Sequence, residues 1–371
     1  MLGSYLQSSI IIAFLFSVMV SFLWFYSESI LILLHQEPQV SKLAALYMKL
    51  LIPGLFAYGF LQCVLRFLQT QTVIIPLVVC SVIPLAIHVG ITYTLVFLTP
   101  LGYRGAPLAA TISLWISFLV LALYVNCADE FKDTWKGISK DSIRYVLPNL
   151  KLAIPSAVMV CLEYCAFEIL VLLAGLLPNS ESSTSLIAMC VNTEAVTYMI
   201  TYGFSAAVST RVSNELGAGN PVRAKNAIAV TLKLSIFLAL TVILSLAFGH
   251  NIWASFFTTS PIIKREFASM TPLLAVSILF DSAQGILSGV SRGCGWQHLA
   301  AWTNLATFYG IGTPIAVLLG FKMGLYAKGL WIGLICGLSC QACALLLITV
   351  RTKWDKIGLS VENGKAQSVL A

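Results

Sequence analysis

Residues 270–297 form an apolar stretch that is long enough to cross a bilayer, yet it carries an acidic residue, Asp281, near its middle. At helical spacing, Ser277, Gln284 and Ser288 fall on the same face as Asp281. A lone carboxyl group is costly at the centre of a membrane, so it is a candidate for function by default. The alternative is a structural acid that is hydrogen-bonded inside a helix bundle.

Carboxyl groups inside apolar spans are concentrated in the second half of the chain, where they belong to Glu163, Glu168, Glu194 and Asp281. Lys233 is the one basic residue in the spans of the same half when Arg292, near the end of the stretch 270–297, is counted with the loops. Carboxyl groups in a low dielectric tend to hold a proton near neutral pH, and two that lie close together disfavour joint ionisation. This composition is typical of a proton relay.

We predict that Glu163 and Asp281 are the proton-coupling residues. Glu168 follows Glu163 by five residues, about 140° around a helix, so we do not expect both to line one cavity. Polar residues on several spans extend the set of possible cavity or relay residues. These are Glu194, Glu168, Asn192, Thr197, Tyr198, Ser277, Gln284 and Asn304. For single residues of this kind, hydrogen bonding between helices is an open alternative.

The composition is that of a polytopic membrane protein with an all-α fold. Of 371 residues, 58% are hydrophobic and 10% are charged, and the mean hydropathy is +0.90. A soluble domain carries about 25% charged residues. The net charge of +7 therefore concerns topology and lipid headgroups, and not nucleic acid. No phosphate-binding loop, metalloprotease motif, hydrolase motif or metal-site spacing occurs in the sequence. We expect no enzymatic activity, no metal and no cofactor, the energy source being a proton gradient.

A window of bilayer length predicts about ten transmembrane helices. They cover residues 10–34, 43–68, 73–98, 107–127, 152–177, 185–209, 226–257, 270–297, 300–321 and 329–350. On the helix 270–297, Gly285, Gly289 and Gly293 form a small-xxx-small face, which predicts close packing of another helix.

The long polar segment 128–151 separates two predicted lobes. We assign residues 1–127 to a partial N-terminal lobe of four helices, 128–151 to a cytosolic linker, 152–352 to a C-terminal lobe of six helices and 353–371 to a cytosolic tail. One set of alternate loops holds about fourteen Lys and Arg and the other about seven. The positive-inside rule then places the first set and both termini in the cytosol.

The chain also repeats itself weakly. Residues 63–71 align with residues 289–297 at an offset of 226, and Arg104-Gly105 align with Lys328-Gly329 at an offset of 224. An even number of helices separates the copies, which predicts a parallel repeat. From this offset we expect a twelve-helix, two-lobe protein whose first lobe lacks its first two helices. The alternative is an asymmetric ten-helix protein with a chance repeat.

Three stretches carry a resemblance to a known family: CLEYCAFEILVLLAGLLPN (161–179), CVNTEAVTYMITYGFSAAVSTRVSNELGAGNP (190–221) and SGVSRGCGWQ (288–297). They resemble plant members of the multidrug and toxic compound extrusion (MATE) transporters. The resemblance implies two six-helix lobes and proton-coupled export of alkaloid-, flavonoid- or xenobiotic-like solutes. In plant members a glutamate and an aspartate of the second lobe are implicated in proton coupling, and Glu163 and Asp281 match these positions.

We therefore expect a monomeric, proton-coupled antiporter in the plasma membrane or the vacuolar membrane. Its partners would be small organic substrates and membrane lipid, and not nucleic acid. One alternative is a lipid-type flippase of similar architecture, which should carry basic residues along its cavity; the predicted spans hold almost none. The other alternative is a non-transporting, truncated remnant or scaffold.

Overall fold

The predicted all-α fold is confirmed. The computed structural model describes residues 2–33, 38–73, 75–135, 137, 139–178 and 180–354, and within these ranges it contains helices, turns and loops but no strand. Most of the predicted tail, from residue 355 onward, lies outside the described residues. The chain divides into two compact units, Met1–Lys151 and Leu152–Ala371.

The first unit is built around α3 (Pro38–Thr70), which packs against α1 (Leu2–Phe25) and α5 (Gly105–Cys127). Its other helices are α2 (Ser27–Leu33), α4 (Ile75–Tyr93), the π-helical segment η1 (Thr94–Leu98) and the short 3-10 turns η2 (Gly102–Arg104), η3 (Asp129–Phe131) and η4 (Lys140–Tyr145). Its core contains Leu68, Leu121 and Phe131. The polar segment after α5 returns to α1, where the Gln7 side chain bonds the backbone of Gly137 and Ser139.

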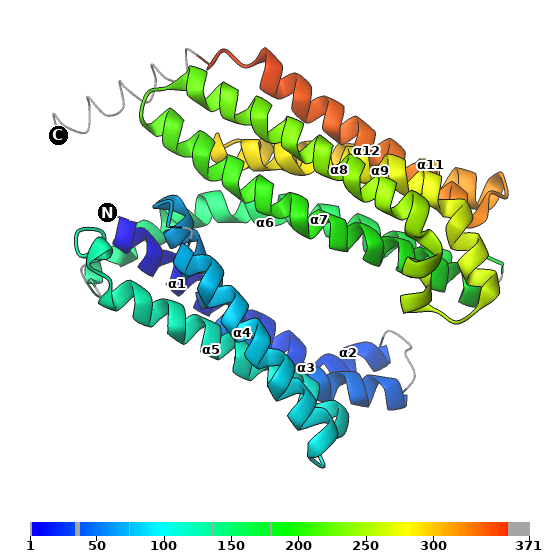
Figure 1. The fold of residues 1–371 in the computed structure, drawn as a ribbon, viewed down its shortest axis with the longest axis horizontal. Coiled ribbons are helices and arrows are strands. Elements are labelled where there is room, and N and C mark those ends of the chain that lie inside the picture. Colours follow the sequence, from blue (N-terminus) through cyan, green and yellow to red (C-terminus); the bar gives the residue numbers. More distant parts are fainter. Residues whose placement is uncertain are drawn as a thin grey trace. The chain divides into compact units, whose positions relative to one another are not determined.

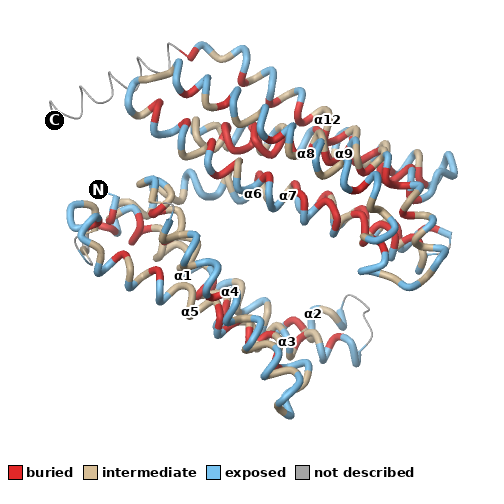
Figure 2. The backbone as a smooth tube through the Cα atoms, in the orientation of Figure 1, coloured by how far each residue is buried: buried red, intermediate tan, exposed pale blue. Residues whose placement is uncertain are grey.

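The second unit surrounds α9 (Pro261–Gly293), which packs against α7 (Ser180–Gly217), α8 (Pro221–Phe257) and α12 (Tyr326–Arg351) (Figure 1). The unit also contains α6 (Val146–Ala174) from its seventh residue on, and a long helix that is divided into α10 (Gln297–Asn304), η5 (Leu305–Gly312), α11 (Thr313–Val317) and η6 (Leu318–Lys322). The π-helical segments η5 and η6 interrupt the predicted helix 300–321. Buried residues are dense along α9 (Figure 2).

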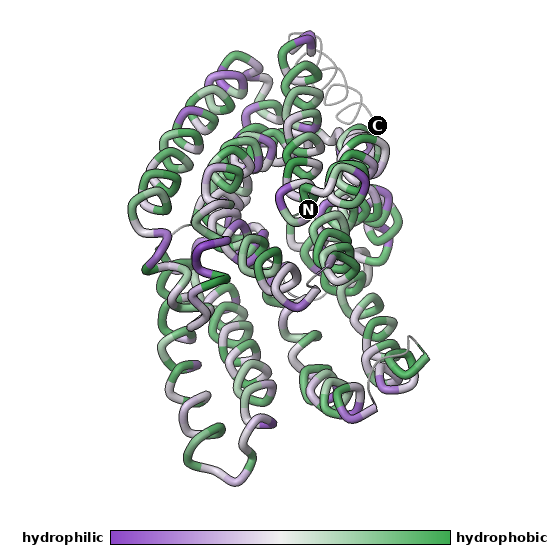
Figure 3. Tube along the Cα trace, turned by 90° about the vertical axis from the view of Figure 1, so that its right-hand side faces the viewer, coloured by the Kyte–Doolittle hydropathy of each residue, from purple (hydrophilic) through white to green (hydrophobic). Residues whose placement is uncertain are grey.

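Nine helices in the described ranges are long and apolar enough to cross a membrane. Hydrophobic residues occur along most of the length of the helices (Figure 3). The predicted span 185–209 lies inside α7, which is not among these nine because its hydroxyl, amide and carboxyl side chains lower its hydropathy. Several of these side chains are buried in the helix packing, namely Thr193, Glu194, Thr197, Thr201 and Ser205. The predicted close packing is confirmed here: a Cβ on Gly293 would lie 2.6 Å from the backbone oxygen of Ser209 on α7.

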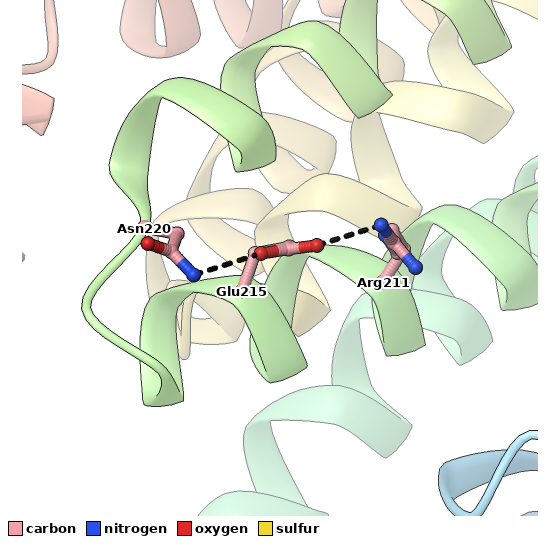
Figure 4. A network of polar contacts seen from close by, with 3 residues as sticks. All are labelled: Arg211, Glu215 and Asn220. Atoms are coloured by element: carbon pink, nitrogen blue, oxygen red, sulfur yellow. Dashed lines mark hydrogen bonds and ion pairs between the residues drawn. The ribbon is translucent and has the colours of Figure 1, made fainter.

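The motif STRVSNELGAGNP ends α7 and starts α8. Glu215 accepts from Arg211 through Oε1 (2.7 Å) and from Asn220 Nδ2 through Oε2 (3.4 Å) (Figure 4). The backbone N–H of Asn220 also donates to the Glu215 carbonyl at 2.8 Å. Gly219 adopts φ +79°, a left-handed conformation that favours glycine at a helix end, and Pro221 then opens α8 where no N–H is needed. The residues of the motif therefore build a tight helix–turn–helix connection.

Candidate functional site

A glutamine joins two buried carboxyl groups in the interior of the second unit. Gln284 Nε2 donates to Glu163 Oε1 at 2.7 Å and to Asp281 Oδ1 at 2.8 Å. The amide oxygen of Gln284 accepts from Ser288 Oγ at 3.1 Å. Gln284 is fully buried, and the exposed fractions of Asp281 and Glu163 are 3% and 7%. The predicted face of Asp281, Gln284 and Ser288 on α9 thus turns inward and meets α6.

A third carboxyl group extends this pair toward α7. Glu194 Oε2 accepts from Ser277 Oγ at 2.9 Å, and Ser277 Oγ in turn accepts from Trp331 Nε1 at 3.2 Å. Glu194 interacts electrostatically with Asp281, and Asp281 interacts with Glu163. Glu194 Oε1 is buried and has no hydrogen-bond partner among the described residues. The three acids therefore form a series that runs from α6 through α9 to α7.

The series opens on a cavity of about 190 Å³ between α6 and α7. Its carboxyl groups come from Glu163, Asp281, Glu194 and Glu168. Its other walls are Tyr164, Phe167, Val191, Asn192, Ala195, Tyr198 and Met199. Since one water occupies about 30 Å³, a cavity of this size has room for several water molecules beside the acids.

The structure corrects one prediction about α6. Glu163 and Glu168 both line the cavity, although their positions differ by about 140° around the helix. Tyr164 and Phe167 lie within that arc and line the cavity as well, so the cavity covers a broad face of α6. Glu163 is buried and Glu168 is exposed. The angle of about 140° between Glu163 and Glu168 therefore does not exclude a shared cavity. It instead places Glu163 at a buried position of the cavity wall and Glu168 at an exposed one.

The other predicted residues divide between the cavity and the surrounding packing. Asn192 and Tyr198 line the cavity, and Asn192 Nδ2 donates to the Ala188 carbonyl in its own helix. Thr197 is buried but donates within α7, to the Thr193 carbonyl at 3.1 Å. Ser277 and Gln284 contact the acids from behind the cavity wall. Lys233, the basic residue that the sequence places in a span of this unit, is exposed and does not line this cavity.

Asn304 lies outside the cavity, in a second buried cluster that the sequence did not indicate. Its Nδ2 donates to the Met159 carbonyl on α6 at 2.8 Å, and its Oδ1 accepts from Gln341 Nε2 on α12 at 2.8 Å. The side chain of Gln341 also interacts with Glu163. Gln341 was missed, although an amide inside the largely apolar stretch of α12 is a signal that could have identified it.

Arg292, also missed as a site residue, provides positive charge near the acids. Arg292 Nη2 donates to Ser205 Oγ at 2.7 Å, and its charge interacts with Glu163. It lies near the end of α9, beyond Ser288. Among the described residues, no three His, Cys, Asp or Glu side chains are grouped so that they could hold a metal ion.

Comparison with known proteins places this geometry in context. Residues 1–94 and 155–318 match the MatE family model. The chain is 58% identical to Protein DETOXIFICATION 18 of Arabidopsis thaliana over 96% of its length and 76% of that protein. It is 43% identical to Protein DETOXIFICATION 16 of the same plant, over 98% of the chain and 75% of the relative. The crystal structure of the eukaryotic MATE transporter AtDTX14 matches with a TM-score of 0.93 at 37% identity, over 98% of this chain and 81% of that one.

Proposed function

The chain belongs to the MatE family of membrane transporters, and on that premise we propose that it exports organic solutes in exchange for protons that Glu163 and Asp281 bind. The family makes it an integral, multi-pass membrane protein of the detoxification and efflux type, and not an enzyme. Proton coupling and the identity of the solutes are the proposal.

The observation that carries the proposal is the bridge from Gln284 to the two carboxyl groups, at 2.7 and 2.8 Å. Two buried carboxylates so close together repel each other when both are ionised, and burial adds to that cost. Uptake of one proton removes the repulsion. It also changes which oxygens can accept from Gln284, since a protonated carboxyl has an O–H to donate. Proton binding can thus alter the contact between α6 and α9.

In the proposed cycle, a proton enters from the acidic side and binds at Glu163 or Asp281. The hydrogen bonds between α6 and α9 then rearrange, and the solute leaves. Loss of the proton toward the cytosol restores the form that binds solute. Glu194, Glu168, Asn192 and Tyr198 would guide water or protons along the cavity, because their side chains line it.

The size of the cavity bears on the substrate. Pockets for drug-sized ligands usually measure about 300–1,000 Å³, and the cavity beside the acids measures about 190 Å³. We therefore assign it to proton and water movement, and we expect alkaloid-, flavonoid- or xenobiotic-like solutes to need further space. No Lys or Arg is among the residues that line this cavity, which disfavours a lipid-type flippase with a phosphate site here.

Three further properties belong to the proposal. We expect the chain to act as a monomer with no cofactor, to lie in the plasma membrane or the vacuolar membrane, and to have both termini in the cytosol. The excess of Lys and Arg in one set of alternate loops supports the orientation.

The test is efflux from proteoliposomes that carry an imposed pH gradient and a fluorescent organic cation. Asp281→Asn should reduce proton-driven efflux to background, because the amide cannot bind the coupling proton. Glu266→Gln is the matched control on the same helix: Glu266 is partly exposed and bonded to Ser182 at 3.2 Å, so this variant should retain efflux. Normal efflux by Asp281→Asn would refute the assignment. Absence of proton-driven efflux in the unmodified chain would favour the non-transporting alternative.

A further inference from the structure

Gln341 on α12 has a buried amide oxygen without a partner. Its side chain is fully buried, and its Nε2 donates to Asn304 Oδ1 at 2.8 Å. No donor among the described residues reaches its Oε1. An unpaired buried acceptor costs the full desolvation of that atom. Such an oxygen gains a hydrogen bond when a donor arrives, and the cost of leaving it unpaired is then removed.

The assigned orientation of the Gln341 amide follows from its neighbours. Asn304 Nδ2 is committed to the Met159 carbonyl at 2.8 Å, so Asn304 presents its oxygen to Gln341. Gln341 must therefore donate from its amide nitrogen, and its amide oxygen is left without a partner. Turning the amide over would place two oxygens against each other. The unpaired oxygen is therefore a consequence of the network and cannot be removed by a simple rotation.

A source of the missing hydrogen lies next to Gln341. The side chain of Gln341 interacts with Glu163, which already accepts from Gln284 through Oε1. An ionised carboxylate can only accept, whereas a protonated carboxyl has one O–H to donate. The amide of Gln341 can thus serve both forms of Glu163: a nitrogen donor for the carboxylate and an oxygen acceptor for the acid.

No other titratable or charged group near the Glu163–Asp281 pair bonds Gln341 Oε1 among the described residues. Tyr309 on η5 donates its hydroxyl to the Leu162 carbonyl at 3.0 Å. The remaining titratable or charged groups around the pair are Arg292 on α9, Glu194 and Tyr198 on α7, and Tyr164 on α6. Among the described residues, none of them bonds the free oxygen of Gln341.

We propose that Gln341 is a positioning residue that accepts a hydrogen bond from the protonated carboxyl of Glu163. This inference rests on the proposed function, in which Glu163 takes up a proton. In the protonated state the chain Glu163–Gln341–Asn304–Met159 is complete. It then links the coupling carboxyl on α6 through α12 back to the α6 backbone, one turn before Glu163. In the ionised state Glu163 has no O–H to donate, so Oε1 of Gln341 stays unpaired.

Infrared difference spectroscopy between alkaline and acidic pH, on the purified full chain, tests the inference. The C=O stretching band of a protonated carboxyl moves to lower frequency when its O–H donates a hydrogen bond. The band of Glu163 is identified by its loss in Glu163→Gln. In Gln341→Met, which removes the acceptor while keeping the length of the side chain, that band should move to higher frequency. Ser339→Ala is the matched control on α12, since Ser339 bonds within its own helix, and it should leave the band in place.

The outcomes separate the inference from the proposed function. An unchanged Glu163 band in Gln341→Met overturns the inference and leaves proton uptake at Glu163 intact. Absence of any Glu163 band at acidic pH in the unmodified chain shows that Glu163 takes up no proton, and the proposed function then fails first. If Gln341→Met does not fold, Gln341→Asn withdraws the same amide by one methylene, and it should shift the band in the same direction.

Discussion

The hairpin before α5 in the first unit and the hairpin before α12 in the second unit are built alike, at an offset of 224 residues. Each follows a π-helical segment, Thr94–Leu98 in one and Leu318–Lys322 in the other. Each then turns through a left-handed residue, Gly102 with φ +54° and Tyr326 with φ +48°. Because π segments are rare and costly to place, their coincidence indicates a repeated backbone plan.

The same offset relates the closest approach of the two helices in each hairpin. A Cβ on Gly105 would lie 2.5 Å from the carbonyl oxygen of Leu95. A Cβ on Gly329 would lie 2.5 Å from the carbonyl carbon of Leu319. The repeat that the sequence predicts at an offset of 224 is therefore confirmed in the backbone of both hairpins.

The weaker alignment of residues 63–71 with residues 289–297, at an offset of 226, does not match the helix ends. Val73 N–H donates to the Leu68 carbonyl at 3.2 Å, and Trp296 N–H donates to the Ser291 carbonyl at 2.8 Å. These two turns end corresponding helices and lie 223 residues apart. The alignment of identical residues at an offset of 226 therefore displaces the turn by three residues.

The interiors of the two units differ although the backbones correspond. At the offset of 223 that relates α3 to α9, the position of Asp281 is occupied by Tyr58, and at the offset of 224 the positions of Asn304 and Gln341 are occupied by Cys80 and Ser117. No carboxyl group is buried among the described residues of the first unit. In the apolar stretch of α9, 67% of the residues are buried, against 22% in that of the corresponding helix α3. A repeated scaffold therefore carries buried carboxyl groups in one copy and none among the described residues of the other.

The difference between the two interiors can be tested most severely by introducing a buried carboxyl group into the first unit. Ala57→Asp places a carboxyl group at a fully buried position of α3, the helix of the first unit that corresponds to α9, and Phe60, one turn later, offers it no hydrogen bond. An acid at the centre of a membrane helix costs about 3 kcal/mol, so the thermal unfolding midpoint of the purified chain should fall steeply. Ala57→Asn matches the volume without the charge and should cost less. Equal midpoints for the two variants at neutral pH would show that the first unit tolerates a buried acid.

The shared hairpin is tested by adding one methyl group to each copy. Gly105→Ala and Gly329→Ala should each cost about 1–3 kcal/mol of stability, because the new Cβ meets backbone that cannot move aside. The two costs should be similar, since the contact is the same. Gly90→Ala in α4 is the control: nothing lies within 4 Å of its added Cβ, and it should stabilise by up to about 1 kcal/mol. A large cost in one hairpin and none in the other would break the equivalence.

Much of the fold could be predicted because membrane helices are apolar over a known length. The predicted helix 152–177 corresponds to α6, and 270–297 overlaps most of α9. Both ends of α7 and the start of α8 extend beyond the predicted spans, so these bounds could not be found from hydropathy, whereas the predicted end at residue 257 is confirmed. The π segments η5 and η6 were also missed, since their composition does not differ from that of an α-helix and they are set by packing against α12.

The candidate site could be predicted in part for a related reason. A carboxyl group in an apolar run is visible in the sequence, and Asp281 and Gln284 share a helical face, so their proximity follows from local geometry. Glu163 meets them only through tertiary packing, and its choice rested on its type and its resemblance to the family. The role of Gln341 depends on which helix α12 packs against. Its contact with Asn304 could therefore not be predicted from the spacing of residues in the sequence.

The smallest predicted effect concerns the left-handed residue of the hairpin. Tyr326 holds φ +48°, which costs a residue with a Cβ about 1–2 kcal/mol, whereas Gly102 occupies the equivalent position without that cost. Tyr326 is 50% exposed, so removing its ring loses little burial. Tyr326→Gly should therefore stabilise the chain by about 0.5–1 kcal/mol, after the extra flexibility of glycine in the unfolded state is subtracted. Gly102→Ala should destabilise by about 1 kcal/mol in the same melting assay. A lower unfolding midpoint for Tyr326→Gly would mean that the ring itself holds the second hairpin, and that the two turns are alike in backbone but not in what stabilises them.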